Sequence, residues 1–98
     1  MSIDDDYDFS IIENTMKERV IETLEAELDK RDSSLCRCDE CVIDMVCYAL
    51  NRLKPNYSAS LYGALYSRAE ADSKQKEIED VVREAVTFVS THTSHSKN

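Results

Sequence analysis

Three stretches of this 98-residue chain carry apolar residues at helical spacing. In the first stretch the apolar residues recur every four positions and face charged residues, which is typical of an amphipathic helix. Ser10 and Glu13 stand at the start of this stripe with the spacing of a capping box. We therefore predict the first helix over residues 10–31. Its stripe comprises Ile12, Met16, Val20, Leu24 and Leu28.

A second helix is predicted after a polar break and a run of cysteines. Its start falls near Asp39 or Glu40, because acidic side chains suit the positive end of a helix. Pro55 ends it, since the residue before a proline is pushed out of helical geometry. The apolar arc of this helix is wide and comprises Val42, Ile43, Val46, Ala49, Leu50 and Leu53.

Two interpretations are open for the segment that follows Pro55. Ser58 or Ser60 is placed to cap a short helix, whereas Gly63 weakens a helix and leaves an extended segment as the alternative. Further on, apolar residues recur at spacings of three and four and predict a long helix over about 70–91. They are Ile78, Val81, Val82, Ala85, Val86 and Val89.

The two ends of the chain are polar. We expect residues 1–9 to be an acidic, mobile N-terminus and residues 92–98 to be a polar tail, which leaves one helical domain over residues 10–91. With one glycine and one proline, the chain has little material for β-turns. The fold class is therefore predicted to be all-α, a three-helix bundle with one small extra helix.

The size of the chain makes additional stabilisation important. A chain of 98 residues buries only roughly 60–65% of the surface that its unfolded form exposes, so a staple or a partner subunit matters. Two of the apolar stripes are broader than a lone bundle needs. Both observations favour a homodimer.

The charge and the N-terminus narrow the choice of partners and compartment. A net charge of −8, from 20 acids and 12 bases, argues against direct nucleic-acid binding and against an anionic membrane surface. The N-terminus has no basic or apolar leader, and no stretch approaches the roughly 18 apolar residues of a membrane span. We expect a cytoplasmic protein, in which cysteines are thiols or metal ligands.

All four cysteines fall within twelve consecutive positions, at Cys36, Cys38, Cys41 and Cys47. Zinc favours four thiolate ligands in a tetrahedron, and Cys38-x2-Cys41 has a spacing common in such sites. Cys36 lies near enough in sequence for the loop to curl three sulfurs round one ion. We predict a structural Zn²⁺ site of four thiolates, which staples the loop before the second helix.

Cys47 is the weakest of the four predicted ligands. If Cys41 lies inside the helix, Cys47 is roughly 9 Å further along it and turned by about 120°. A buried small hydrophobe is then the alternative role of Cys47, and His92, Asp39 or a dimer mate could supply the fourth ligand. Arg37 either donates to the thiolates or is a solvated loop residue.

The segment Cys36-x-Cys38-x2-Cys41-x2-Asp44-x4-Ala49-Leu50-Asn51-Arg52-Leu53-Lys54-Pro55-x-Tyr57 resembles the signature of the late competence protein ComFB family. On the first helix, Asn14-x3-Glu18-x-Val20 fits the same family, and the resemblance covers about residues 10–90. It implies a small, helical, cytoplasmic and dimeric protein associated with the uptake of transforming DNA. Related proteins are described as receptors for cyclic dinucleotide second messengers.

The resemblance implies a non-enzymatic regulatory protein that binds zinc and a cyclic dinucleotide, cyclic di-GMP or cyclic di-AMP. Such a ligand needs cations for its phosphates, flat side chains for its bases and a carboxylate for a guanine edge. The candidate residues are Lys17, Arg37, Asp44, Asn51, Arg52, Lys54 and Tyr57. An enzyme is not expected, because the chain has no glycine-rich phosphate loop and no set of nucleophile, histidine and acid. The alternatives are a structural adaptor of the DNA-uptake machinery, which holds an unidentified protein partner, and a redox sensor that uses the cysteines.

Overall fold

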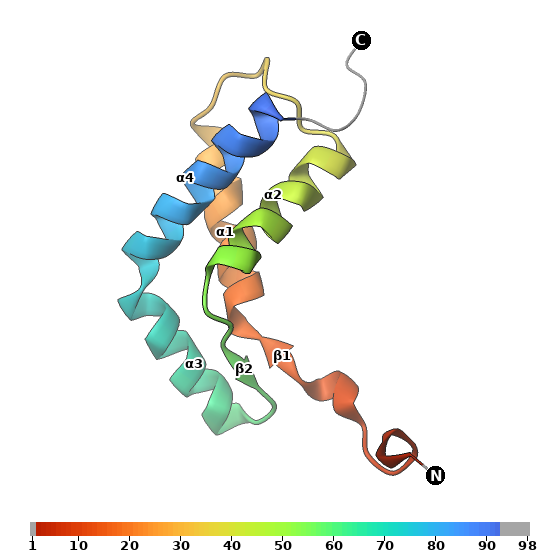
Figure 1. The fold of residues 1–98 in the computed structure, drawn as a ribbon. Coiled ribbons are helices and arrows are strands. Elements are labelled where there is room, and N and C mark those ends of the chain that lie inside the picture. The colour runs from red at the N-terminus through yellow and green to blue at the C-terminus, as the bar shows by residue number, and fades with distance from the viewer. Residues whose placement is uncertain (1, 93–98) are drawn as a thin grey trace.

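The structure is a computed structural model that describes residues 2–92, and the predicted tail lies outside the described residues from position 93 onward. The helices of this part are α1 (Thr15–Asp29), α2 (Asp39–Arg52), α3 (Leu61–Ser73) and α4 (Gln75–Thr91). Two short strands, β1 (Glu13–Asn14) and β2 (Tyr57–Ser58), pair antiparallel, and two 3-10 turns, Ile3–Asp5 and Phe9–Ile11, precede them (Figure 1). The fold is therefore mostly helical.

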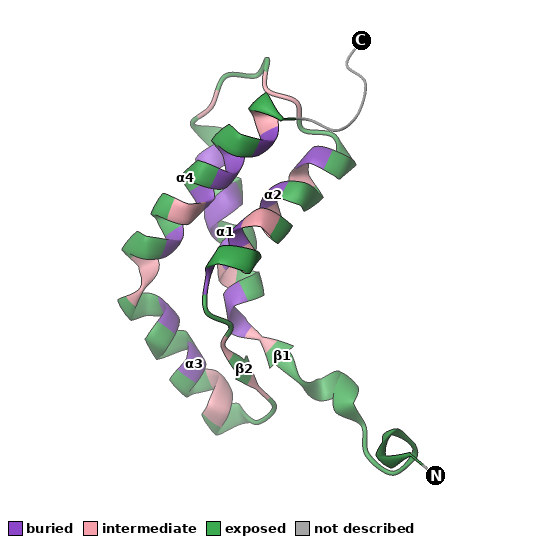
Figure 2. Cartoon of the chain, viewed as in Figure 1, coloured by how far each residue is buried: buried purple, intermediate pink, exposed green. Residues whose placement is uncertain are grey.

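Helices α1, α2 and α4 pack together as the predicted three-helix bundle, and α3 extends from it beside the start of α1 (Figure 1). The sides of these helices that face one another are buried, as Figure 2 shows. The core is made of Met16, Val20, Leu24 and Leu28 on α1, Cys41, Met45 and Ala49 on α2, and Ile78, Val82, Ala85, Val86 and Val89 on α4, with Leu53 directly after α2. The apolar spacings in the sequence thus identified most of the core.

The predicted start of the first helix at Ser10 is wrong. Ser10 lies in a 3-10 turn capped by Asp8, and α1 begins only at Thr15. Asn14 caps α1, because its Oδ1 accepts a hydrogen bond from the backbone N–H of Met16 at 3.2 Å. Ile12 therefore lies outside the stripe, with 47% of its surface exposed.

The all-α prediction missed the small sheet that decides where α1 begins. Glu13 pairs with Ser58 and Asn14 with Tyr57, so residues 13–14 are extended rather than helical. The Oδ1 of Asn14 also accepts from the backbone N–H of Asn56 at 2.8 Å. One side chain thus caps a helix and ties it to a segment 42 residues away.

The structure confirms the predicted start of the second helix at Asp39. This helix ends at Arg52, with Leu53 as the capping residue. The boundary between the last two helices is a correction. The extra helix is not small, since α3 runs to Ser73, and the chain breaks at Lys74 before α4 begins at Gln75. Residues 70–73 thus belong to α3 rather than to the last helix.

Residues 2–12 form an N-terminal arm that runs away from the bundle, at the end opposite the cysteine loop (Figure 1). All residues of the arm are exposed, as the continuous green in Figure 2 shows. Whether the predicted acidic segment 1–9 moves stays a prediction. Among the described helices, none has the length and apolar character needed to cross a membrane.

Candidate metal centre

The loop between α1 and α2 positions the first cysteines through its own polar contacts. The Asp32 carboxylate accepts from the backbone N–H of Ser34 at 2.9 Å, and the Asp32 carbonyl accepts from that of Leu35 at 3.1 Å. Leu35 is half-buried and packs against the core. The Arg37 guanidinium donates to the carbonyls of Arg31 and Asp32 at 3.3 and 3.4 Å. Arg37 thus binds the loop to the end of α1.

Three of the four cysteines come together at the start of α2. The Sγ atoms of Cys36, Cys38 and Cys41 all lie within 4.8 Å of one another. Cys38 is the N-cap of α2, where its sulfur accepts from the backbone N–H of Cys41 at 3.4 Å. Cys41 is buried, Cys36 is half-buried and Cys38 is exposed, so the cluster lies at the edge of the core.

The chemistry of this donor set fits a thiophilic metal ion. Four sulfurs at a Zn–S distance of 2.3 Å would lie about 3.8 Å apart, so a small contraction of the cluster suffices. Burial, and then the neighbouring sulfurs of Cys36 and Cys38, raise the pKa of the Cys41 thiol to about 12. A cation among the three sulfurs would offset their mutual repulsion and favour the thiolates. The three cysteines can therefore hold a metal ion.

The other predicted ligands lie outside this group among the described residues. Cys47 is exposed on α2, six residues beyond Cys41, which is the third residue of the helix. The helical rise places the two residues about 9 Å apart along the axis of α2. The His92 ring stacks on Phe88, with centroids 4.3 Å apart, and neither His92 nor Asp39 joins the sulfur cluster.

The residues predicted to contact a cyclic dinucleotide are all exposed and lie in separate places. Lys17 and Lys54 line different cavities. Arg37 lies on the cysteine loop before α2, and Arg52 is the last residue of that helix. One chain thus spreads its candidates over both ends of α2. The complete set is Lys17, Arg37, Asp44, Asn51, Arg52, Lys54 and Tyr57.

A ladder of stacked side chains along α2 and α4 was not foreseen from the sequence. The Cζ atom of Arg52 lies 3.6 Å from the Tyr48 ring centroid, and the Tyr48 and Phe88 centroids are 4.8 Å apart. The Tyr48 hydroxyl donates to the Glu84 carboxylate at 2.7 Å. This hydrogen bond and burial raise the pKa of Tyr48, whereas the Arg52 charge lowers it. The spacing of four between the partners on each helix was the available signal.

An apolar groove lies between α1 and α2. It has a volume of about 590 Å³ and continues the wide apolar arc of α2 towards the surface. Cys47 opens into this groove, and Lys17 and Glu25 lie on its rim. We call it the α1–α2 groove; its apolar lining is Ile21, Leu24, Leu28, Val42, Ile43, Val46 and Leu50.

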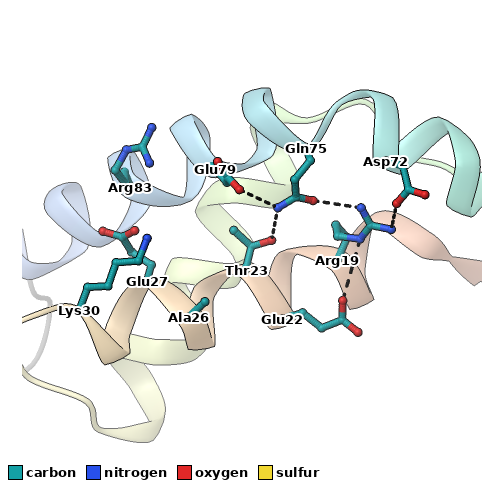
Figure 3. A pocket seen from close by; sticks show the side chains of 10 residues that line it. All are labelled: Arg19, Glu22, Thr23, Ala26, Glu27, Lys30, Asp72, Gln75, Glu79 and Arg83. Atoms are coloured by element: carbon teal, nitrogen blue, oxygen red, sulfur yellow. Dashed lines mark hydrogen bonds and ion pairs between the residues drawn. The ribbon is translucent and has the colours of Figure 1, made fainter.

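A second hollow, of about 540 Å³, lies between α1 and α4 and is polar (Figure 3). The Arg19 guanidinium donates to Asp72 at 2.7 Å and to Gln75 at 3.0 Å, and Gln75 donates to Thr23 and Glu79. These polar groups largely satisfy one another. The hydrogen bonds that line this hollow thus hold the α3–α4 junction against α1.

The fold is a small helical bundle in which a two-stranded sheet joins the start of α1 to the segment after α2. Its three clustered cysteines, at the start of α2, place it in the class of small helical proteins with a candidate metal site. The family model of the late competence development protein ComFB matches residues 13–93, and the chain belongs to this family. The solved structure of the late competence protein ComFB from Bacillus subtilis is similar, with a TM-score of 0.72 and 23% identity. The match covers 88% of this chain and 99% of that one, and it supports the fold alone. No curated protein matches this chain.

Proposed function

We propose that this protein is a non-enzymatic, zinc-binding regulatory protein of late competence that acts in the cytoplasm as a homodimer. The observation that carries the metal part is the approach of Cys36, Cys38 and Cys41 to within 4.8 Å at the start of α2. Membership of the ComFB family supports the association with competence. The exposed apolar lining of the α1–α2 groove supports a second subunit.

In this proposal the zinc ion is structural. Cys36 and Cys38 lie in the loop and Cys41 lies in α2, so an ion shared by the three would join the loop to the helix. The N-cap bond from Cys41 N–H to the Cys38 sulfur also favours a thiolate at that position. The ion would then stabilise the entry of α2 into the core, because binding energy at such a site adds directly to folding.

Elemental analysis of the purified chain tests this role. We expect one zinc ion per chain, and a lower melting temperature after chelation. Cys38→Ser removes a ligand and should abolish stoichiometric zinc. Cys47→Ser is the matched control, because Cys47 lies outside the sulfur cluster, and this variant should keep the metal. Metal-free protein that melts at the same temperature with and without a chelator would refute the proposal.

The cyclic dinucleotide part of the proposal is supported by the exposed C-terminal end of α2. Asn51 and Arg52 are the last residues of α2, Lys54 lies two residues beyond its end, and all three are exposed. The planar Arg52 guanidinium stacks on Tyr48, with 46% of its side chain exposed. Such a group can pair with a phosphate and stack on a base. The end of α2 thus favours a ligand that carries both a phosphate and a base, as a cyclic dinucleotide does.

Calorimetric titration with cyclic di-GMP and cyclic di-AMP tests the ligand. We expect binding of one of them to the zinc-loaded protein, weakened about tenfold or more by Arg52→Ala. Arg68→Ala, which alters an exposed arginine on α3, is the control and should bind normally. Absence of binding by folded, zinc-loaded protein at high ligand concentration would sink this part.

One surface favours the alternative role of a structural adaptor in DNA uptake. Helix α3 exposes large apolar side chains along one side, with 84% of Tyr62 and 80% of Tyr66 accessible. Exposed apolar patches of this kind often contact other proteins. A stable partner that co-purifies with the chain, is lost in Tyr62→Ser and is indifferent to cyclic dinucleotides would favour the adaptor.

A further inference from the structure

The N-terminal arm is rich in large apolar side chains that are exposed over about half of their surface, and one of them, Ile11, lines a hollow beside β2 and the start of α3. Within residues 2–12 its hydrogen bonds close on the arm itself, as in the bonds from Tyr7 N–H to Ile3 and from Ile12 N–H to Phe9. The Tyr7 and Phe9 rings lie near each other, with centroids 6.1 Å apart. The exposed fractions are 63% for Ile3, 65% for Tyr7, 43% for Phe9, 55% for Ile11 and 47% for Ile12. Burial of these side chains against an apolar surface would be favourable, because it would remove their apolar area from water.

The α1–α2 groove is an apolar hollow that no other part of the described residues covers. It is therefore a surface that could receive such an apolar segment. Ile43 is 61% exposed and Ile21 is 45% exposed, one from each wall. The groove follows α1 from Lys17 to Leu28, a rise of roughly 16 Å. The eleven residues of the arm span up to about 36 Å when extended, so an arm that is shortened by two 3-10 turns is still long enough to fill the groove.

The arm of one chain points away from its own groove. Ile12 is extended, with φ −71° and ψ 128°, and leads straight into β1, which is tied to β2. The arm therefore leaves the bundle at the start of α1 (Figure 1). To cover its own groove it would have to reverse direction beside this ladder, and residues 2–12 contain neither glycine nor proline for a tight turn.

We propose that two copies of this chain exchange arms, so that the arm of each lies in the α1–α2 groove of the other. The inference rests on the proposed homodimer and specifies its contacts. Each chain brings one arm and one groove, so the exchange closes with two-fold symmetry. The groove rim carries one cation, Lys17, and one anion, Glu25, and Lys17 is the group that would pair with the acidic arm. The arm carries Asp4, Asp5, Asp6 and Asp8.

The area available is that of a stable interface. Five half-exposed large side chains offer on the order of 100 Å² each, or about 500 Å² per arm. Two arms and the groove surface that they cover would bury about 2,000 Å² in total, at the upper end of standard protein interfaces. The arm also lies wholly outside the family match, which begins at residue 13. The exchange is thus inferred from this chain's own arm and groove.

Cross-linking between two differently tagged full-length chains tests the exchange. One chain carries Phe9→Cys and Cys47→Ser, and the other keeps Phe9 and Cys47, which opens into the groove. With zinc added and a short bismaleimide as the linker, we expect a covalent dimer joined from position 9 of one chain to position 47 of the other. Peptide mass mapping identifies this link. The first chain alone lacks the groove thiol and is the control.

Sedimentation measurements on single variants complete the test. Phe9→Ser and Ile43→Asp change exposed residues and should raise the dissociation constant of the dimer by about 30-fold or more. Tyr62→Ser, on the exposed side of α3, should change it less than about threefold.

Three results would overturn the exchange. A dimer that forms without the 9–47 link and withstands Phe9→Ser would leave the homodimer but exclude the arms. A 9–47 link within one chain that carries only Phe9→Cys would show that the arm covers its own groove. A chain that stays monomeric at high concentration would overturn both the exchange and the homodimer.

Discussion

Replacement of Asn14 by alanine should destabilise the fold more than its place at the edge of the bundle suggests. The Oδ1 atom of Asn14 accepts two backbone hydrogen bonds, from Met16 at 3.2 Å and from Asn56 at 2.8 Å. The first caps α1 and the second holds the segment that leads into β2. Alanine removes both acceptors at once.

The size of the effect follows from these two bonds. Loss of an N-cap asparagine costs about 1 kcal/mol. The half-buried N–H of Asn56 loses its partner, which costs about 1 kcal/mol more. A total of about 2 kcal/mol should lower the melting temperature by roughly 8–16 °C for a chain of this size.

Thermal unfolding followed by circular dichroism measures this shift. Asn14→Asp keeps an oxygen acceptor and should cost less than half as much. Asn51→Ala is the matched control, because Asn51 is exposed within α2 and alanine is a better helix former there. If Asn14→Ala melts as Asn51→Ala does, the double role of the Asn14 side chain is refuted.

Three further outcomes follow from the packing and polar contacts. Met45→Ala empties a site that is only 1% exposed and should cost about 2–5 kcal/mol in chemical denaturation, whereas Leu61→Ala, at a position 77% exposed, should cost under about 0.5 kcal/mol. The raised pKa of Tyr48 means that its contribution to stability is present below the unfolded pKa of about 10 and is lost as the pH rises through the folded value. Tyr48→Phe should therefore flatten the alkaline side of a stability–pH curve, and an unchanged slope would contradict this. Arg19→Ala should cost about 1 kcal/mol and speed amide exchange at residues 72–76, whereas Arg68→Ala should change neither.

The sequence alone determined the helical character of the chain and most of its core. The period of the apolar residues assigned the inner faces of α1 and α4, because a helix buries one stripe whatever its neighbours are. On α2 it found Ala49 and Leu53 but missed the buried Cys41 and Met45. The other residues of its predicted arc line the α1–α2 groove, where Ile43 is 61% exposed. The sequence also determined that Cys36, Cys38 and Cys41 come together. Their closeness depends on a short loop and one helix start, and both are local.

The positions of Cys47 and of the candidate ligand-binding residues could not be predicted from the sequence in this way. The seven candidate ligand residues were identified by chemical type, and chemical type does not tell which of them share a surface in the folded chain. Cys47 could be placed only once the start of α2 was known, since each residue turns the helix by about 100° and a shift of one residue brings the sulfur to a different side. The groove into which Cys47 opens is formed by α1 and α2 together, so it exists only once these two helices pack side by side.

The start of α1 and the break between α3 and α4 were decided by contacts between distant segments. Both Ser10 and Asn14 are good capping residues, and the bond to Asn56, 42 positions away, selects Asn14. At the break, Arg19 holds Asp72 and Gln75, which lie 53 and 56 positions from it. Local preference allows several boundaries that differ little in free energy, and long-range pairing adds the increment that selects one of them.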